Sequence, residues 1–461
     1  MQYLRVIDLL KKRPVGSTVE ITGWLKSCRI SKNVSFLDIS DGSCLSGIQA
    51  VLDTGASGAE EASARLATGC SVIVNGTLVD SPAQGQDVEL QVTHIEVVGG
   101  SPESYPLQKK RHSFEFLREI SHLRARTNSL GAVFRVRSAL AYAVHTFFNE
   151  RGFVYVHTPI ISTGDCEGAG ETFTVTALDL KKVPLADGMV DWRQDFFGQQ
   201  ANLTVSGQLE AEAYAMALGN VYTFGPTFRA EDSNTSRHLA EFWMVEPEMS
   251  FCDLTTDIDI AEEFLQYLVR YTLEHCEEDL NLFAKFVDKS LPSRLDQVLE
   301  RPFVRLSYTE AVELLGKAKV NFQYPISWGT DLQSEHERYL SEQVFRQPVV
   351  LTDYPQAIKP FYMRVNSDEK TVAAMDILCP GIGEMVGGSQ REERLGVLTA
   401  RMEALAMDMD RYQWYLDLRR YGSVPHAGFG LGFERMVQFV TGMKNIREVI
   451  AFPRTPGSAG F

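Results

Sequence analysis

Five short runs in the first hundred residues alternate apolar and polar positions, the pattern of half-buried strands. A helical stretch at residues 60–66 separates the third run from the fourth. Five strands with one helix predict a small closed barrel of the OB type, with another small β-domain as the alternative. The runs cover residues 19–25, 35–39, 47–52, 71–79 and 88–92.

Beyond residue 100 the pattern becomes a mixture of helical and extended stretches. Two extended runs at 221–231 and 240–251 enclose a polar stretch, which predicts a long hairpin. A further helix is expected to follow Gly432. Apolar residues recur at helical spacing in the stretches 131–151, 254–276 and 309–315.

These changes of pattern divide the chain into three parts. We expect a barrel domain over residues 1–100, a hinge over 101–128, and a larger domain of helices and strands over 129–461. Within the larger domain, the segment at about 279–335 has the least regular pattern and reads as an insertion. The expected fold class is therefore α+β.

Composition narrows the classes of function. The formal net charge is −15 and the sequence pI is about 5.2, so a nucleic acid would have to be met by a local basic patch. The seven cysteines are scattered without a Cys-x-x-Cys pair, which argues against a zinc site and a disulfide framework. No apolar run is long enough for a membrane span or a signal peptide. We expect a cytoplasmic protein without a disulfide partner.

The predicted hairpin carries the first candidate chemistry. Because side chains alternate across a strand, the second arm has an apolar face and a face with two carboxylates. Arg229 and Glu231 share a face of the first arm, where a surface ion pair is the simplest interpretation. The apolar face contains Trp243, Val245, Met249 and Phe251, and the other face contains Phe242, Met244, Glu246 and Glu248.

Read as a whole, the hairpin sequence FRAEDSNTSRHLAEF at 228–242 resembles motif 2 of the class II aminoacyl-tRNA synthetases, in the subgroup for aspartate, asparagine and lysine. The helix from Gly131 with the strand ending at Pro159 resembles motif 1, which implies a homodimer. GFGLGFER at 428–435 resembles motif 3. The resemblance implies a catalytic domain built on an antiparallel sheet flanked by helices, with ATP as substrate.

Within motifs 2 and 3 the resemblance assigns ATP contacts to five residues. Arg229 would bind the α-phosphate, and Glu231 would meet adenine or the phosphate tail. His238 would contact the β- or γ-phosphate, although it could also be a solvated loop residue. Phe242 would stack under adenine, with Arg435 above it and reaching the γ-phosphate. Arg229 and Arg435 are the expected catalytic residues, since both would neutralise charge on the reacting phosphates.

A later segment, MDILCPGIGEMVGGSQR at 375–391, carries the candidate metal ligands. Asp376 and Glu384 are hard oxygen ligands suited to Mg²⁺ that bridges phosphates. The resemblance assigns the metal to Glu384, which would also belong to the ATP-binding residues, and less directly to Asp376. It assigns recognition of the substrate side chain to Arg391.

The segment LTVSGQLEAE at 203–212 indicates which amino acid is bound. Aspartyl enzymes carry a lysine three residues after the glutamine, but this chain has Ala211 there. An amide needs one donor and one acceptor, which Arg391 and Glu212 could supply, with Gln208 beside them. Glu212 would also repel an aspartate side chain. Glu210 is the alternative acceptor.

Together with DFFG at 195–198 and GSQREER at 388–394, this segment resembles the bacterial asparaginyl-tRNA synthetases. The implied amino acid is L-asparagine, and the implied partner is tRNA(Asn). Glu167 lies in a glycine-rich loop similar to the one that closes over the amino acid in that family.

The resemblance also gives the barrel a function, the reading of the anticodon. Phe36 would stack on an unpaired base, Gln49 would bond the central uridine, and Arg29 would supply charge. Phe36 could instead belong to the barrel core.

Three other functions are considered. An aspartyl-tRNA synthetase is the main alternative. An inactive synthetase-like regulator is disfavoured because Arg229, Glu384 and Arg435 are all present. An ammonia-using asparagine synthetase of the same catalytic fold is disfavoured because such enzymes lack the N-terminal barrel.

Overall fold

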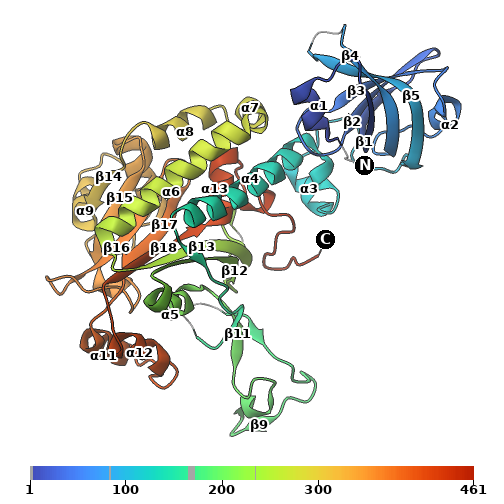
Figure 1. Ribbon diagram of the computed structural model, residues 1–461. Coiled ribbons are helices and arrows are strands. Elements are labelled where there is room, and N and C mark those ends of the chain that lie inside the picture. The colour runs from blue at the N-terminus through green and yellow to red at the C-terminus, as the bar shows by residue number, and fades with distance from the viewer. Residues whose placement is uncertain (1–3, 83–84, 165–171, 234, 461) are drawn as a thin grey trace. The chain divides into compact units, whose positions relative to one another are not determined.

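The computed structural model describes residues 4–82, 85–164, 172–233 and 235–460. Contacts divide the chain into two compact units, which are described separately. The first consists mainly of residues 1–136, and the second of residues 137–275 and 283–460. The division falls within helix α4 (Asn128–Glu150). Figure 1 shows the elements of both units.

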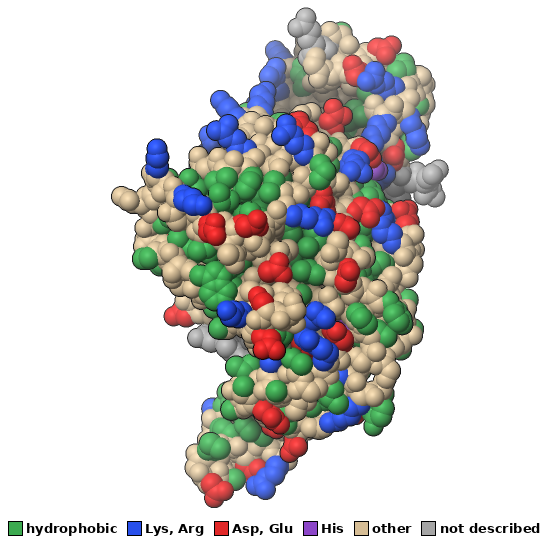
Figure 2. Space-filling view, turned by 90° about the vertical axis from the view of Figure 1, so that its left-hand side faces the viewer, with side chains coloured by type: hydrophobic (Ala, Val, Ile, Leu, Met, Phe, Trp, Pro, Cys, Tyr) green, Lys and Arg blue, Asp and Glu red, His purple; other side chains and the backbone are tan. Residues whose placement is uncertain are grey.

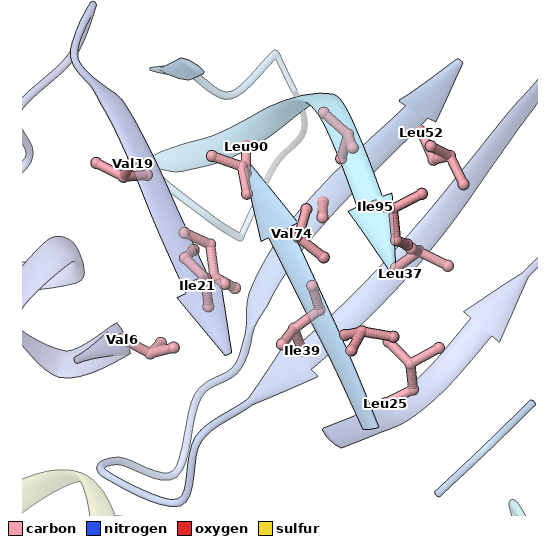
Figure 3. Packing of buried hydrophobic residues seen from close by; sticks show 14 of the residues in the cluster. Val6, Val19, Ile21, Leu25, Leu37, Ile39, Leu52, Val74, Leu90 and Ile95 are labelled. Atoms are coloured by element: carbon pink, nitrogen blue, oxygen red, sulfur yellow. The ribbon is translucent and has the colours of Figure 1, made fainter. Parts of the chain in front are cut away.

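The first unit contains the predicted barrel, with its strands closed in the order β1-β2-β3-β5-β4. Alternate side chains of each strand point inward, which produces an apolar interior (Figure 3). Val74 and Leu90 are completely buried there, on neighbouring strands. The strands are β1 (Thr18–Arg29), β2 (Val34–Ser40), β3 (Ile48–Asp53), β4 (Ser71–Asp80) and β5 (Val88–Gly99).

Short helices accompany the barrel. The helix expected over 60–66 is α2 (Ala59–Ser63), which is shorter than its apolar pattern suggested. In the hinge, Ser113 caps α3 (Phe114–Glu119) by accepting a hydrogen bond from the backbone of Phe116. Another α-helix of this part is α1 (Val6–Lys12).

The second unit is organised around a sheet of eight strands. Its interior pairs are antiparallel, as expected, but β14 pairs with β15, and β6 with β12, in parallel. The sheet is therefore mixed. The order across it is β14 (Val304–Ser307), β15 (Val349–Pro355), β16 (Thr371–Cys379), β17 (Gly383–Gln390), β18 (His426–Gly432), β13 (Glu241–Ser250), β12 (Asn220–Phe228) and β6 (Val154–Tyr155).

Strands β12 and β13 form the predicted hairpin, with Thr227 opposite Phe242. Val245 and Met249 are buried as expected from the apolar face of the second arm. The assignment of Phe251 to that face is wrong: its side chain is 82% exposed. The strand ends at Ser250, and Phe251 has a φ of 57°, so the alternation of the strand does not continue to it.

Helix α6 (Leu254–His275) covers one face of this sheet, crossing β16, β17 and β18 (Figure 1). Its Phe264 packs against Phe429 of β18, with ring centroids 6.1 Å apart. The other helices of the unit are α5 (Gln208–Leu218), α8 (Leu291–Leu299), α9 (Tyr308–Gly316), α10 (Ser334–Arg338), α11 (Leu395–Ala404), α12 (Gln413–Arg420) and α13 (Phe433–Thr441). Helix α7 spans Glu277–Phe286.

The segment at about 279–335 contributes to the main sheet. It forms α8, the edge strand β14 and α9, and Tyr308 and Leu315 of α9 join the core on β15. Small additional strands occur after motif 1. These are β7 (Ile161–Ser162), β8 (Thr174–Val175) and β11 (Ala201–Leu203) in one sheet, and β9 (Leu185–Ala186) and β10 (Met189–Val190) in another.

The surface of the molecule mixes both signs of charge. On the face shown in Figure 2, acidic and basic side chains are interspersed with apolar ones. Within the described ranges, no helix has the length and apolarity needed to cross a membrane. The six cysteines that the structure describes all carry free thiols.

Candidate active site

The central positions of the candidate site lie on the sheet face opposite α6. Phe429 points toward α6, so its neighbour Gly428 faces the other way. Glu248 and Ser389 pair with Gly428 on either side and therefore share its face. Gly387 pairs with Gly430, two residues further along β18, and lies on the same face. The candidate site is thus built on one side of the sheet.

On the hairpin, Arg229 and Phe242 lie together. The guanidinium carbon of Arg229 lies 5.5 Å from the ring centroid of Phe242, within range of a cation–π contact. The backbone N–H of Arg229 donates to the carbonyl of Ala240 at 3.0 Å, which continues the hairpin pairing beyond β12. This arrangement presents a cation next to an aromatic face.

His238 lies in the exposed loop of the hairpin among charged residues. Its Nδ1 is 2.8 Å from Ser233 Oγ and 2.7 Å from Thr235 Oγ1. Partial shielding from solvent lowers the pKa of His238, and the positive charges of Arg435 and Arg229 lower it further, whereas Glu231 opposes them. The charges of three other predicted ATP residues, Arg229, Glu231 and Arg435, therefore act on His238.

A cavity of about 450 Å³ lies beside this loop. Three of its lining residues are the predicted His238, Glu384 and Arg435. Arg435 Nη1 donates to the backbone carbonyl of Glu384 at 3.0 Å and lies 3.5 Å from its carboxylate. The lining also includes the acidic residues Asp288 and Glu337, and cations are in the majority because the basic residues Arg237, Arg294, Arg338 and Lys444 line it too. A cavity with this lining suits a polyphosphate.

The two predicted metal acids reach the same point because of a β-bulge. Residues 384 and 387 are three apart, so in a regular strand they would face opposite sides. A register shift between Ile377 and Leu378 adds one residue on β17, which returns Glu384 to the face of Gly387. Asp376 pairs directly with Gly387. The structure thus brings Asp376 and Glu384 together.

The surroundings of Asp376 fix one of its oxygens. Lys359 Nζ donates to Asp376 Oδ2 at 2.8 Å and lies 3.9 Å from the ring centroid of Tyr354. Burial raises the pKa of Asp376, and Lys359 opposes that shift. The other oxygen, Oδ1, is directed toward Gly387. The two carboxylates therefore fit a hard cation whose other ligands would be phosphate oxygens. Within the described residues, no cluster of three or more acidic, His or Cys ligands exists.

Glu337 of α10 is an additional carboxylate at this site. Its Oε2 accepts a hydrogen bond from the backbone N–H of Glu384 at 3.1 Å. Burial, with the nearby Glu384 acting in the same direction, raises the pKa of Glu337 to about 7. Glu337 is far from the metal segment along the chain, and no sequence motif links the two, so the sequence could not have indicated it.

Arg391, the predicted reader of the substrate side chain, is held by Glu248. Its Nε donates to Glu248 Oε2 at 3.1 Å and its Nη2 donates to Oε1, while Nη1 donates to Ser389 Oγ at 2.9 Å. Both charged side chains are buried. Burial disfavours the charge of Arg391, but Glu248 outweighs it and raises the pKa.

Glu212, the predicted acceptor, is fully buried and has several partners of its own. Arg419 Nη2 donates to Glu212 Oε2 at 2.8 Å, and His426 Nε2 lies 3.0 Å from the same oxygen. Gln208 Nε2 donates to Oε1 at 3.1 Å. Burial raises the pKa of Glu212, but Arg419 and His426 together outweigh it and hold the pKa below its ordinary value.

A second acid of the hairpin, Glu246, fixes the segment before α5. It accepts hydrogen bonds from the backbone of Gly207 at 3.1 Å and from Thr223 at 3.2 Å, and also from Ser206. Glu210, the alternative acceptor, instead accepts from Ser162 at 3.2 Å. The face that carries Glu246 and Glu248 was recognised in the sequence, but their individual partners were not.

In the barrel, the three predicted anticodon residues lie on its outer surface. Arg29 is directly opposite Phe36 on β1 and β2, so their side chains share a face. Asp38, two residues after Phe36, pairs with Gln49, which places Gln49 on that face as well. Phe36 is 39% exposed, which excludes the alternative that it is a core residue.

Two further residues of the barrel were not predicted from the sequence. Gln49 Nε2 donates to Glu89 at 3.2 Å. Trp24, on β1, is also exposed and was not singled out in the sequence. The predicted loop residue Glu167 lies outside the described residues.

The comparisons with known proteins identify the family. The family model of the tRNA synthetases class II (D, K and N) matches residues 113–456. The family model of the OB-fold nucleic acid binding domain matches residues 19–98. The chain is 58% identical over 462 residues to an asparagine–tRNA ligase of Synechocystis sp., which covers 100% of both chains. The chain belongs to the class II asparagine–tRNA ligases.

Other asparagine–tRNA ligases are similarly close to this chain over nearly its whole length. One from Desulfotalea psychrophila is 60% identical over 456 residues, with 99% of each chain covered. The crystal structure of asparaginyl-tRNA synthetase from Pyrococcus horikoshii, complexed with asparaginyl-adenylate, aligns with a TM-score of 0.87 and 34% identity over 100% of this chain and 99% of that one. The predicted family and α+β fold are confirmed, and the asparagine–tRNA ligases are favoured over their aspartyl counterparts.

Proposed function

We propose that the protein joins L-asparagine to tRNA(Asn) in two steps, through an asparaginyl-adenylate, with release of diphosphate and AMP. The observation that carries this proposal is the pairing of chemistries at the amino-acid end of the site: Arg391 supplies a fixed cation, and Glu212 supplies a buried carboxylate that stays ionised. One donor beside one acceptor matches an amide, while Glu212 repels a carboxylate.

In the first step, the asparagine carboxylate attacks the α-phosphate of ATP and diphosphate leaves. Arg229 would bind the α-phosphate, and the ring of Phe242, 5.5 Å from its guanidinium carbon, would support adenine. Arg435 and His238 line the cavity that suits the leaving diphosphate. Catalysis then rests on positioning and on neutralising phosphate charge.

Asp376 and Glu384 are the residues that would hold Mg²⁺. The bound ion would offset the charge that develops on the phosphates. Lys359 fixes Asp376 from one side, and Glu337 fixes the backbone of Glu384 from another. These contacts hold the carboxylate of Asp376 and the backbone of Glu384 in place before ATP binds.

In the second step, the terminal ribose hydroxyl of the tRNA attacks the adenylate and AMP leaves. We propose that the barrel binds the anticodon through Phe36, Gln49 and Arg29, which lie together on its outer surface. An exposed ring with neighbouring polar groups suits unpaired bases. Because tRNA and ATP are used together in translation, we place the reaction in the cytoplasm.

We also propose a homodimer. Strand β6 of motif 1 ends the sheet as far as the described residues extend, and apolar side chains are exposed there. They belong to Val154, Tyr155, Ile160 and Ile161. Apolar side chains at an open sheet edge favour contact with another chain. Sedimentation at assay concentrations tests this, and the mass of a single chain would contradict it.

Aminoacylation tests the proposal as a whole. Purified protein, ATP and tRNA are incubated with radiolabelled asparagine or aspartate, and acid-precipitable tRNA is counted. Charging with asparagine alone supports the proposal. Charging with aspartate alone would establish the aspartyl alternative.

A further inference from the structure

Helix α12 carries two buried side chains that end on Glu212, about two hundred residues earlier in the chain. The hydroxyl of Tyr415 lies 2.9 Å from Glu212 Oε1 and 2.8 Å from Oε2. Arg419 Nη2 donates to Glu212 Oε2 at 2.8 Å and to the Tyr415 hydroxyl at 2.9 Å. Tyr415 is completely buried, and Arg419 is 5% exposed. Both side chains therefore act in the interior, on a single carboxylate.

Arg419 is itself fixed by the backbone beside Arg391. Its Nε donates to the carbonyl of Glu392 at 2.9 Å, one residue after Arg391. Its charge faces Glu212 and the ring of Tyr415, whose centroid is 4.1 Å from the guanidinium carbon. The same side chain thus links the predicted acceptor to the segment that carries the predicted donor.

A buried ion pair of this kind does not by itself indicate that the residues serve to stabilise the fold. Apolar residues of similar size often stabilise a core as well or better. Such a network does fix the position and the charge of the carboxylate at its centre, here that of Glu212. The charges of Glu212 and Arg391 attract each other, and Glu248 holds Arg391 through hydrogen bonds from Nε and Nη2. The relative placement of the two groups therefore depends on the partners of each.

We infer that Tyr415 and Arg419 are positioning residues for amino-acid specificity, which hold the carboxylate of Glu212 in place as the acceptor that acts with Arg391. This inference rests on the proposed function of Glu212. With its oxygens held by α12, the carboxylate can accept from an amide nitrogen in one geometry and cannot turn away from a substrate carboxylate. Loosening it weakens asparagine binding and the rejection of aspartate together, and leaves the ATP site unchanged.

Tyr415→Phe is the sharpest test, because it removes one hydroxyl and preserves the packing of the ring. In the diphosphate exchange assay we expect the KM for asparagine to rise about tenfold, the loss typical of one hydrogen bond to a charged group. The KM for ATP is expected to stay the same. The ratio of kcat/KM for asparagine to that for aspartate is expected to fall.

Tyr308→Phe is the matched control. Tyr308 of α9 is also completely buried. Its hydroxyl donates at 2.6 Å to the carbonyl of Thr330, in the loop that follows α9, and its hydrogen bonds among the described residues do not include Glu212. It reports what the loss of a buried hydroxyl does to folding alone. The thermal midpoints of both variants are measured, and only Tyr415→Phe is expected to change the asparagine-to-aspartate ratio.

Arg419→Lys and Glu212→Gln complete the test. If Glu212→Gln changes the ratio while Tyr415→Phe and Arg419→Lys do not, the inference about α12 is overturned and the proposed role of Glu212 stands. If Glu212→Gln itself leaves the ratio unchanged, the proposed role of Glu212 falls, and the inference with it. In the double variant Tyr415→Phe/Glu212→Gln, we expect the effects on the ratio to be less than additive, because both changes act on one interaction.

Discussion

Asp376 and Glu384 approach the same point above Gly387. A Cβ atom placed on Gly387 would lie 3.2 Å from Glu384 Oε1 and 3.4 Å from Asp376 Oδ1. The two acids come from neighbouring strands, and a bulge in β17 turns Glu384 to the side of Asp376. The absence of a side chain at residue 387 therefore leaves the space between the carboxylates open.

Gly387→Ala tests whether that space holds Mg²⁺. The added methyl would lie close to both carboxylates, so we expect the Mg²⁺ concentration for half-maximal exchange to rise several-fold. Gly396→Ala is the control, because nothing lies within 4 Å of the position of its added Cβ. Equal Mg²⁺ requirements in both variants would argue against a metal at this point.

Arg229→Ala tests the α-phosphate contact. Loss of a charged donor from the reacting phosphate is expected to lower adenylate formation by at least about 10²-fold. Thermal unfolding and sedimentation are expected to stay close to those of the unmodified protein. Arg270→Ala, which removes an exposed arginine from α6, serves as control. Normal exchange by the Arg229 variant would refute the assignment.

Phe36→Ala separates the barrel from the catalytic unit. If Phe36 stacks on an anticodon base, its removal costs about 1–3 kcal/mol of tRNA binding. We expect a higher KM for tRNA(Asn) and an unchanged rate of exchange, which needs no tRNA. Val98→Ala, at another exposed position of the barrel strands, should leave both unchanged. Equal loss of charging and exchange in Phe36→Ala would indicate a structural role instead.

The lowered pKa of Glu212 leads to a prediction about how the preference for asparagine depends on pH. Arg419 and His426 outweigh burial and hold that pKa below its ordinary value of 4.5. The ionised form therefore stabilises the fold above the unfolded-state pKa, and that stability is lost only as the pH falls through the lower, folded-state pKa. Glu212 keeps its charge between about pH 6 and pH 8, where a free aspartate is ionised as well.

We therefore expect the preference for asparagine over aspartate to be constant across that range. The exchange rate with each amino acid is measured at several pH values, and the two are compared as a ratio. A growing use of aspartate toward the acid end would mean that Glu212 becomes protonated there, contrary to its position against Arg419.

Alternation of apolar and polar residues was sufficient to predict the barrel, because each strand has one face in the interior and one in solvent. The same rule placed Glu246 and Glu248 on one face of the hairpin. It failed at Phe251, where the strand had already ended, and at the sheet edges, because β6 and β14 are too short to show their direction of pairing.

The predicted site residues came from contiguous motifs, and most of their partners did not. Glu248 is far from Arg391 in sequence, and α12 is farther still from Glu212. A buried acid and its cation leave no periodic pattern in a single sequence, so only the fold brings them together. The sequence therefore indicated Glu212 as a free acceptor, whereas the structure gives it a network of donors.

Diphosphate exchange with asparagine and aspartate, assayed separately without tRNA, tests the central claim most directly. Radiolabelled diphosphate enters ATP only if the amino acid forms an adenylate. We expect exchange with asparagine and little with aspartate, since Arg391 and Glu212 together match an amide. Exchange with aspartate alone would contradict this account.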